Sequence, residues 1–190
     1  MYNLTKNITF NFIAIIFIVA LSVNAYSKEL SDKTQRALPQ EIQVKLKNPI
    51  LVGSATLNIL IFDFYDIDLW AQTDQLDYNR IFAISIKYKK NFSKESLVSQ
   101  SIKEMRKNSP VSAEQELRYK KDLNSVFMEI KPGDVKSAIF IPNSHLELYH
   151  NHEFIGNITD QRLARLFVDI WLNEESSFPK LTAKLIGKNE

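Results

Sequence analysis

The segment of residues 149–187 constrains the fold more than any other part of this sequence. It contains apolar residues at i, i+3, i+4, i+7 and i+8, a spacing that predicts an amphipathic helix with one buried face. Thr159 stands at the expected N-cap of this helix, with Asp160 just behind it. A stripe of this width must pack against another apolar layer of the protein. Its members are Leu163, Leu166, Phe167, Ile170 and Trp171, which we interpret as core residues.

A turn and a short helix flank this amphipathic helix. Residues 151–152 predict a turn that leads into a short apolar strand at 154–155. After the helix, Pro179 interrupts the chain, and the apolar residues within 181–186 predict a short closing helix that stops at Gly187. The whole segment is therefore expected to form one unit of turn, strand and two helices.

The first 25 residues have the organisation of a secretory signal peptide. Lys6 precedes an apolar stretch over residues 8–23, and Val23-Asn24-Ala25 resembles a processing site. The alternative is an uncleaved membrane anchor, because a stretch of this size approaches the minimum that spans a bilayer. We expect an exported, periplasmic protein, with secretion or anchoring as alternatives. Residues 26–40 are polar and are expected to form a flexible leader.

Composition limits the remaining function classes. Without residues 1–25 the chain of 190 residues retains 165, which is enough for one domain. Its net charge of +2 falls to +1 without Lys6, so there is no electrostatic case for binding nucleic acid or an anionic membrane surface. The absence of cysteine excludes disulfides and thiolate metal sites. We expect no cofactor and no stable membrane insertion after signal cleavage, and leave protein partners open.

The remaining sequence alternates between strand and helix patterns. Strands are expected first, then helices that begin after the N-caps Ser93 and Ser112, then strands again. This order predicts an α+β fold in which helices pack on one face of an antiparallel β-sheet. The expected strands cover residues 41–47, 52–61, 62–72, 80–89, 135–141 and 146–150.

Four groups of residues along the chain resemble, in the same order, the bacterial chalcone isomerase-like family. They are Gly53, Phe62, Tyr65, Leu69, Trp70 and Ala71; Ile86-Lys87-Tyr88; Lys131-Pro132-Gly133-Asp134; and the segment of residues 149–187. The resemblance covers the mature chain and implies a chalcone isomerase-like domain over residues 41–190. It also implies the open-faced sandwich of that family, with a ligand held between sheet and helices.

The chain departs from the family at the positions that carry isomerase chemistry. Gly53 stands where the resemblance places an arginine, Tyr65 stands at a threonine position, and Phe92 lies near a tyrosine position. The resemblance therefore implies a member without isomerase activity that binds a small apolar or fatty-acid-like ligand through Tyr65, Tyr88 and Phe92. One alternative is an intramolecular lyase or isomerase of an enone-type substrate, with Tyr65 as donor and a lysine replacing the arginine. Another is an envelope scaffold protein with a filled core.

Other polar residues have simpler interpretations. The three histidines, His145, His150 and His152, lie close together in sequence, but their place at a turn favours a structural role over a metal site. Asp66 and Asp68 share one side of a strand and are interpreted as surface charges rather than as an acid–base pair. The basic residues of a solvated rim offer a candidate site for an anionic head group, which could contact either Lys87 or Arg106.

Overall fold

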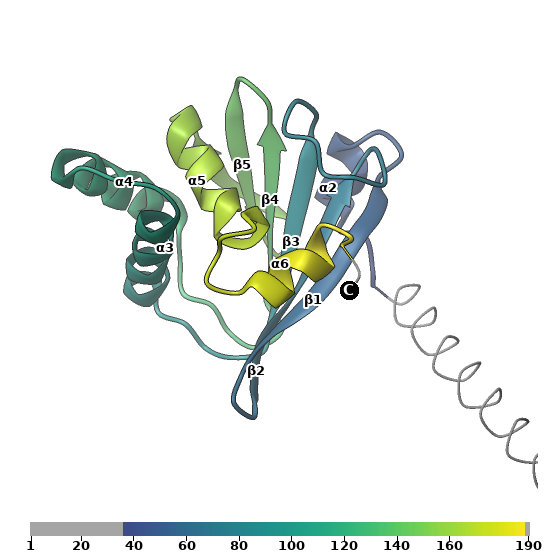
Figure 1. Ribbon diagram of the computed structural model, residues 1–190, viewed down its shortest axis with the longest axis horizontal. Helices are drawn as coiled ribbons and strands as arrows, with labels where there is room; N and C mark the ends of the chain where they lie inside the picture. The colour runs from purple at the N-terminus through teal and green to yellow at the C-terminus, as the bar shows by residue number, and fades with distance from the viewer. Residues whose placement is uncertain (1–35, 189–190) are drawn as a thin grey trace, which may run out of the picture. The chain divides into compact units, whose positions relative to one another are not determined.

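A computed structural model describes residues 36–188, so the expected signal peptide and most of the expected leader lie outside the described residues. Residues from Leu38 onward form one compact unit (Figure 1). Among the residues described, no helix is long and apolar enough to cross a membrane. The elements, in chain order, are α2 (Gln40–Lys45), β1 (Ile50–Ile59), β2 (Phe62–Ala71), β3 (Phe82–Tyr88), α3 (Lys94–Asn108), α4 (Ala113–Val126), β4 (Val135–Ile141), β5 (His145–His150), β6 (Glu153–Ile158), α5 (Gln161–Leu172) and α6 (Pro179–Leu185).

The six strands form one antiparallel sheet in the order β1-β2-β3-β4-β5-β6, so each strand pairs with its neighbours in the chain. Helices α3 and α4 are inserted between β3 and β4. The larger core joins one sheet face to helices α3–α6. The α+β class and the antiparallel sheet with a layer of helices, α3–α6, on one face are therefore confirmed, and α2 is an additional helix on the other face.

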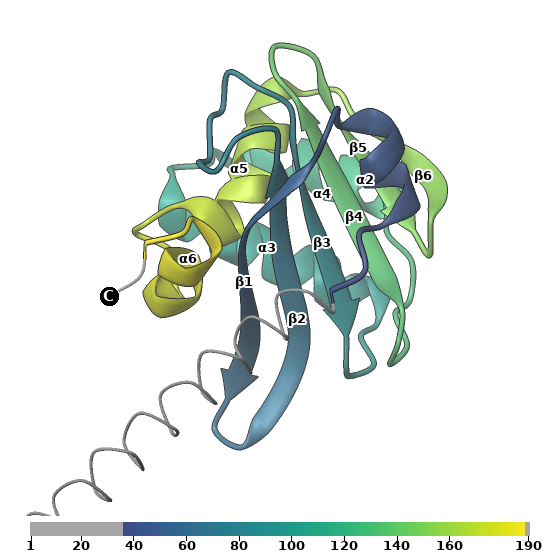
Figure 2. The same cartoon turned by 90° about the vertical axis from the view of Figure 1, so that its right-hand side faces the viewer.

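Helix α2 lies on the opposite sheet face (Figure 2). It covers a smaller apolar cluster there. Here the expectation of a strand over residues 41–47 was wrong, because α2 is a helix. Ile42 and Leu46 are fully buried, whereas Val44 is 74% exposed. Alternating apolar residues at i, i+2 and i+4 fit a half-buried strand, but i and i+4 also share one face of a helix. Tertiary packing of these two residues decides in favour of the helix.

Polar contacts, one of them buried, also hold α2 on this face. The Glu41 carboxylate accepts hydrogen bonds from the Ser137 hydroxyl at 2.5 Å and pairs with His152 Nδ1 at 2.8 Å. Lys45 pairs with Glu147 at 2.8 Å. These contacts join a helix near residue 41 to strands more than ninety positions later.

The amphipathic helix of the closing segment is confirmed as α5, and its whole apolar stripe is buried. Its N-cap is Asp160 rather than the expected Thr159, because a carboxylate oxygen of Asp160 accepts a hydrogen bond from the Leu163 N–H at 3.0 Å. The turn at Asn151 and His152 is also present, with φ angles of 48° and 73°. Two successive positive φ values are typical of a type I′ hairpin turn.

Candidate functional site

A cavity of about 330 Å³ lies between the helix-covered face of the sheet and helices α3 and α5. Residues from all six strands line it, and Phe127, Phe167 and Phe178 close it from the helix side. The scaffold alternative required an interior filled by side chains, and this cavity contradicts that requirement. A volume of this size lies at the lower end of the range for ligand sites, about 300–1,000 Å³.

The three residues expected to contact a ligand all line this cavity. Tyr65 on β2 lies directly opposite Tyr88 on β3, and their ring centroids are 5.8 Å apart in an edge-to-face arrangement. Phe92 follows β3 and packs against Tyr88 with a centroid distance of 5.4 Å. The structure thus brings these residues together, and their role in ligand binding stays a prediction.

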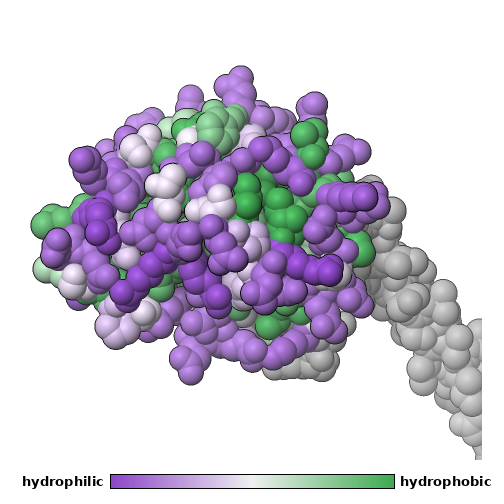
Figure 3. Space-filling view, turned by 90° about the horizontal axis from the view of Figure 1, so that it is seen from above, coloured by the Kyte–Doolittle hydropathy of each residue, from purple (hydrophilic) through white to green (hydrophobic). Residues whose placement is uncertain are grey.

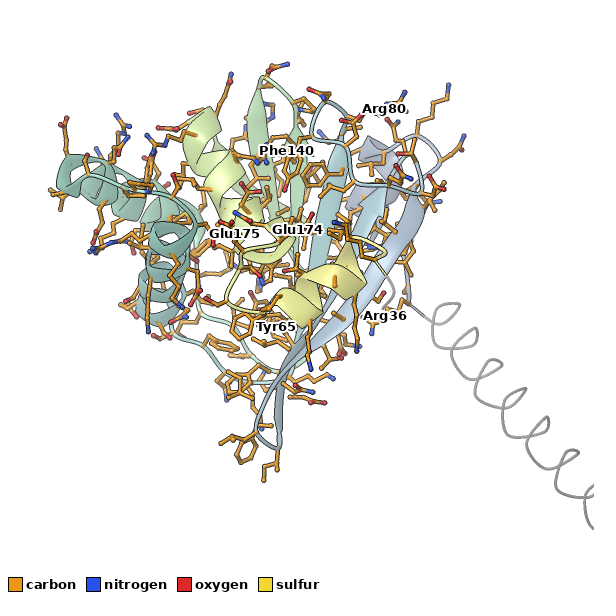
Figure 4. The ribbon with its side chains drawn as sticks, in the orientation of Figure 1. Arg36, Tyr65, Arg80, Phe140, Glu174 and Glu175 are labelled. Carbon is orange, nitrogen blue, oxygen red and sulfur yellow. The ribbon has the colours of Figure 1, made fainter. Side chains whose placement is uncertain are left out.

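The Tyr65 hydroxyl accepts a hydrogen bond from Trp171 Nε1 of α5 at 2.8 Å. Burial raises the pKa of Tyr65 to about 12, so the hydroxyl stays protonated at neutral pH. Because the indole occupies only an acceptor position, the hydroxyl proton can be donated to a molecule in the cavity. Figure 4 labels Tyr65 below α6, towards the end of the molecule that carries the β1–β2 turn.

Lys136 is the cationic residue in the lining, and it was not among the residues expected to contact a ligand. Its Nζ is buried without a hydrogen-bond partner among the described residues and lies 4.6 Å from the centroid of the Phe127 ring. Burial lowers the pKa of this ammonium to about 8, against the opposing attraction of Asp134. Within residues 36–188, the apolar chamber therefore holds a cation that makes no direct ion pair.

Lys136 and the two tyrosines share one sheet face across three neighbouring strands. Ile86 on β3 lies opposite Lys136 on β4, so Tyr88, two residues further on, is its diagonal neighbour. Diagonal neighbours across antiparallel strands are about 7–8 Å apart, within reach of long side chains. An anion placed between them could accept hydrogen bonds from both the ammonium and a tyrosine hydroxyl.

Glu104 provides the acidic group of the lining, on the α3 side. Its buried carboxylate accepts hydrogen bonds from Gln100 Nε2 at 2.7 Å, Lys107 Nζ at 3.0 Å and the Ser177 hydroxyl at 2.5 Å. These contacts compensate its charge and join α3 to the segment before α6. Glu104 therefore does not serve as the counter-ion of Lys136.

The position of the expected arginine is outside the cavity lining. A Cβ on Gly53 would overlap the carbonyl oxygens of Lys184 and Leu185, because the end of α6 packs directly on this part of β1. The two candidates for the basic rim also lie elsewhere. Lys87 is exposed on β3, and Arg106 pairs with Glu116 at 3.1 Å.

The histidines occupy three separate polar contacts. His145 pairs with Glu147 at 3.4 Å, His150 with Asp134 at 3.6 Å, and His152 with Glu41. Within residues 36–188, no group of three or more histidine or acidic side chains could hold a metal ion. These contacts favour structural roles.

The two strand aspartates also make local contacts. Asp66 accepts a hydrogen bond from Thr56 at 2.6 Å, and Asp68 accepts one from Ser54 at 2.7 Å. These bonds join β1 to β2 along the edge of the sheet.

The chain is similar to one known family and to two individual proteins. Residues 31–187 match the profile of the family described as chalcone isomerase-like. An uncharacterized protein of Haemophilus influenzae is 25% identical over 140 residues, which cover 73% of this chain and 68% of that protein. The crystal structure of a fatty-acid binding protein of Arabidopsis thaliana is similar, with a TM-score of 0.59 and 14% identity over 74% of this chain and 88% of that one. At this identity the structural likeness concerns the fold.

Proposed function

The chain belongs to the chalcone isomerase-like family, and from this premise we propose that it binds an amphipathic carboxylic acid, such as a fatty acid, without isomerising it. The main support for this proposal is the Lys136 ammonium, which is buried in an apolar cavity and has no hydrogen-bond partner among the described residues. A buried charge without a partner is costly, and an anionic ligand would remove that cost. The hydrocarbon part of the ligand would then contact the aromatic and aliphatic walls.

The cavity volume sets the size of the ligand. A methylene group takes up about as much space as a water molecule, about 30 Å³, so a cavity of about 330 Å³ fits a medium-length acyl chain. The carboxylate would accept hydrogen bonds from Lys136 and from the hydroxyl of Tyr88 or Tyr65. The plant protein of similar fold is named as a fatty-acid binding protein, which supports this ligand class.

Binding without turnover is supported by two features of the site. Isomerisation of an enone requires donors aimed at a developing oxyanion, and the expected arginine position is Gly53, where α6 leaves no room for a side chain. In addition, the pKa of about 12 makes the Tyr65 hydroxyl a weak acid. Both features favour a binding protein.

An intramolecular lyase or isomerase is the second candidate, and one observation favours it. Tyr65 and a lysine, Lys136, do line the same cavity, as that alternative required. Turnover of a chalcone-like enone by the wild-type chain, lost in Tyr65→Phe, would establish this candidate in place of the first.

Native mass spectrometry of the protein purified from the envelope of its own host tests the proposal directly. We expect a bound medium-chain carboxylic acid and, because we also propose export to the periplasm, a chain mass that lacks residues 1–25. A protein without a bound acid that also fails to bind added decanoate contradicts the ligand proposal. A full-length mass contradicts processing alone.

Affinity for decanoate is expected to be highest between about pH 5 and pH 8. Below this window the ligand carboxyl is protonated, since ordinary carboxyl pKa values are near 4. Above it the Lys136 ammonium, whose pKa is about 8, loses its charge. Calorimetric titration from pH 6 to pH 10 should show affinity falling up to about tenfold per pH unit above 8. Decanol has the same hydrocarbon chain and no charge, so it is the matched control ligand, and its affinity should not depend on pH in this way. The same pH dependence of affinity for decanoate and decanol would contradict the role of Lys136.

A further inference from the structure

The turn between β1 and β2 exposes four consecutive large apolar side chains. Ile59 is 45% exposed, Leu60 92%, Ile61 88% and Phe62 51%. Hairpin turns ordinarily carry glycine, asparagine, aspartate or other small polar residues. Leu60 also adopts a φ of 57°, a left-handed conformation that disfavours residues other than glycine. The chain thus keeps apolar side chains at a position where both solvation and backbone geometry favour other residues.

These four residues, here called the apolar tip, project away from the core. In Figures 1 and 2 the β1–β2 turn is the lowest part of the described chain. The opposite end of the molecule, seen from above in Figure 3, is largely hydrophilic. We propose that the apolar tip inserts into the surface of a phospholipid membrane that contains anionic head groups.

Although the net charge of the chain gives no reason to expect an anionic surface, the local charges around the apolar tip suit one. Lys89 pairs with Asp63 at 3.3 Å and Asp66 at 2.8 Å, which compensates the carboxylates next to the tip. The Lys90 ammonium lies 5.2 Å from the centroid of the Phe62 ring and makes no ion pair among the described residues. A lysine beside an inserted aromatic ring can keep its amine at the level of the head groups.

Basic and acidic side chains on two neighbouring loops modulate this attraction. The loop after β3 and the loop before β4 are joined by paired hydrogen bonds between Phe92 and Ile130. The second loop adds the exposed Lys131, while the exposed acids nearby are Glu95 and Glu129. Because charges of both signs are present, apolar insertion carries most of the binding and head-group charge adds to it.

A membrane fits the apolar tip better than a second copy of the chain. Ile59 belongs both to the tip and to the lining of the cavity, so apolar surface runs from the tip into the cavity. A membrane is a reservoir of apolar chains, and this continuity gives such a chain a route between the two. The other large apolar side chains that are exposed lie on separate elements of the described chain and offer no matching patch: Val44, Ile50, Leu117, Met128 and Phe154.

The insertion can be tested with site-specific labels because the chain contains no cysteine. In the full-length protein, Ile61→Cys and, as a matched control, Leu117→Cys each carry one environment-sensitive fluorophore. Leu117 is also well exposed, at 71%, but lies on α4 away from the tip (Figure 1). With vesicles of phosphatidylcholine and phosphatidylglycerol, we expect a blue shift and quenching by spin-labelled acyl chains at position 61 and neither at position 117. Both proteins carry the apolar N-terminal stretch, so it cannot produce this difference.

Two further variants separate insertion from charge. Leu60→Ser with Ile61→Ser should weaken vesicle partitioning at least about tenfold, since two large apolar side chains leave the lipid. Lys90→Gln should weaken binding to anionic vesicles about fivefold and leave neutral vesicles unaffected. Equal signals at positions 61 and 117 would overturn the proposal. A blue shift at position 61 that depends on protein concentration without vesicles would instead assign the tip to self-association. Neither result depends on the bound acid, so the proposed ligand stands or falls separately.

Discussion

Lys136→Met is expected to weaken decanoate binding at pH 7 by about 10- to 100-fold and, at the same time, to stabilise the protein. A hydrogen bond to a charged group contributes about 1.5–3 kcal/mol, which gives this loss of affinity. Methionine has a similar length and no charge, so it fills the same space beside Phe127 without the desolvation cost. Loss of function combined with a gain of stability is typical of a residue retained for binding.

The gain of stability follows from the lowered pKa of Lys136. Burial lowers this pKa from 10.5 to about 8, and each pKa unit corresponds to about 1.4 kcal/mol. The difference between these two pKa values corresponds to at most about 3.5 kcal/mol. We therefore expect the free energy of unfolding of the variant to rise by up to about 3 kcal/mol at pH 7, as measured by urea denaturation. Lys121→Met, on the exposed surface of α4, is the matched control and should change stability by less than about 0.5 kcal/mol.

The pH dependence of stability provides a second readout for Lys136. Below pH 8 the ammonium is charged in both folded and unfolded chains, so its cost is fully present. As the pH rises from 8, the folded chain loses this proton before the unfolded chain does, and wild-type stability should increase relative to Lys136→Met. Above about pH 10 both proteins should lose stability alike, because burial raises the pKa of Tyr65 and Tyr88 in each of them, so the difference between them is unaffected. A variant with unchanged affinity, or with lower stability than the wild type, would contradict the role assigned to Lys136.

Much of the fold could be predicted because local patterns and packing agree. The apolar stripe of α5 can be buried in only one orientation of the helix, with Phe167 and Trp171 facing the core. The sheet provides the apolar surface against which this stripe packs. Ser93 caps α3 as expected, since its hydroxyl accepts a hydrogen bond from the Ser96 N–H at 3.1 Å. Each strand pairs with the strands that precede and follow it in the chain, so the order of strands in the sheet is the same as their order in the sequence.

The sequence was less informative where distant contacts decide the outcome. The helix α2 depends on Glu41 and Ile42 meeting the far face of the sheet, which no local pattern reveals. The cavity is closed in part by Phe127 and Phe167, whose ring contact depends on where α4 ends relative to α5. Lys136 did leave a signal, because it alternates with Ala138 and Phe140 on the buried side of β4. A lysine at an inward position of an otherwise apolar strand indicates a functional site.

Gly53→Ala is expected to lower the free energy of unfolding by about 3 kcal/mol or more. The added Cβ would overlap the carbonyl oxygens of Lys184 and Leu185, and backbone atoms cannot move aside as a flexible side chain can. The helix α6 must therefore shift away from β1, which exposes Leu181 and Leu185 of the larger core. Urea denaturation measures the loss, and faster hydrogen exchange in residues 179–187 should locate it.

Gly133→Ala separates this steric effect from backbone strain. Gly133 has a φ of 96°, yet no atom lies within 4 Å of a Cβ placed there. We expect this control to cost about 1–2 kcal/mol through strain alone, with no change in exchange at α6. Equal losses in the two variants would show that α6 does not pack on Gly53 as described.

The same overlap predicts that Gly53→Arg does not place a guanidinium in the cavity and so does not confer isomerase activity. A longer side chain meets the same carbonyl oxygens at its first carbon, so the guanidinium could reach the cavity only after α6 has left β1. We expect this variant to be at least as destabilised as Gly53→Ala and to show no turnover of a chalcone-like enone. A stable, active Gly53→Arg protein would instead mean that α6 can move. In that case the missing arginine, rather than the packing of α6, would account for the absence of isomerase activity that we propose.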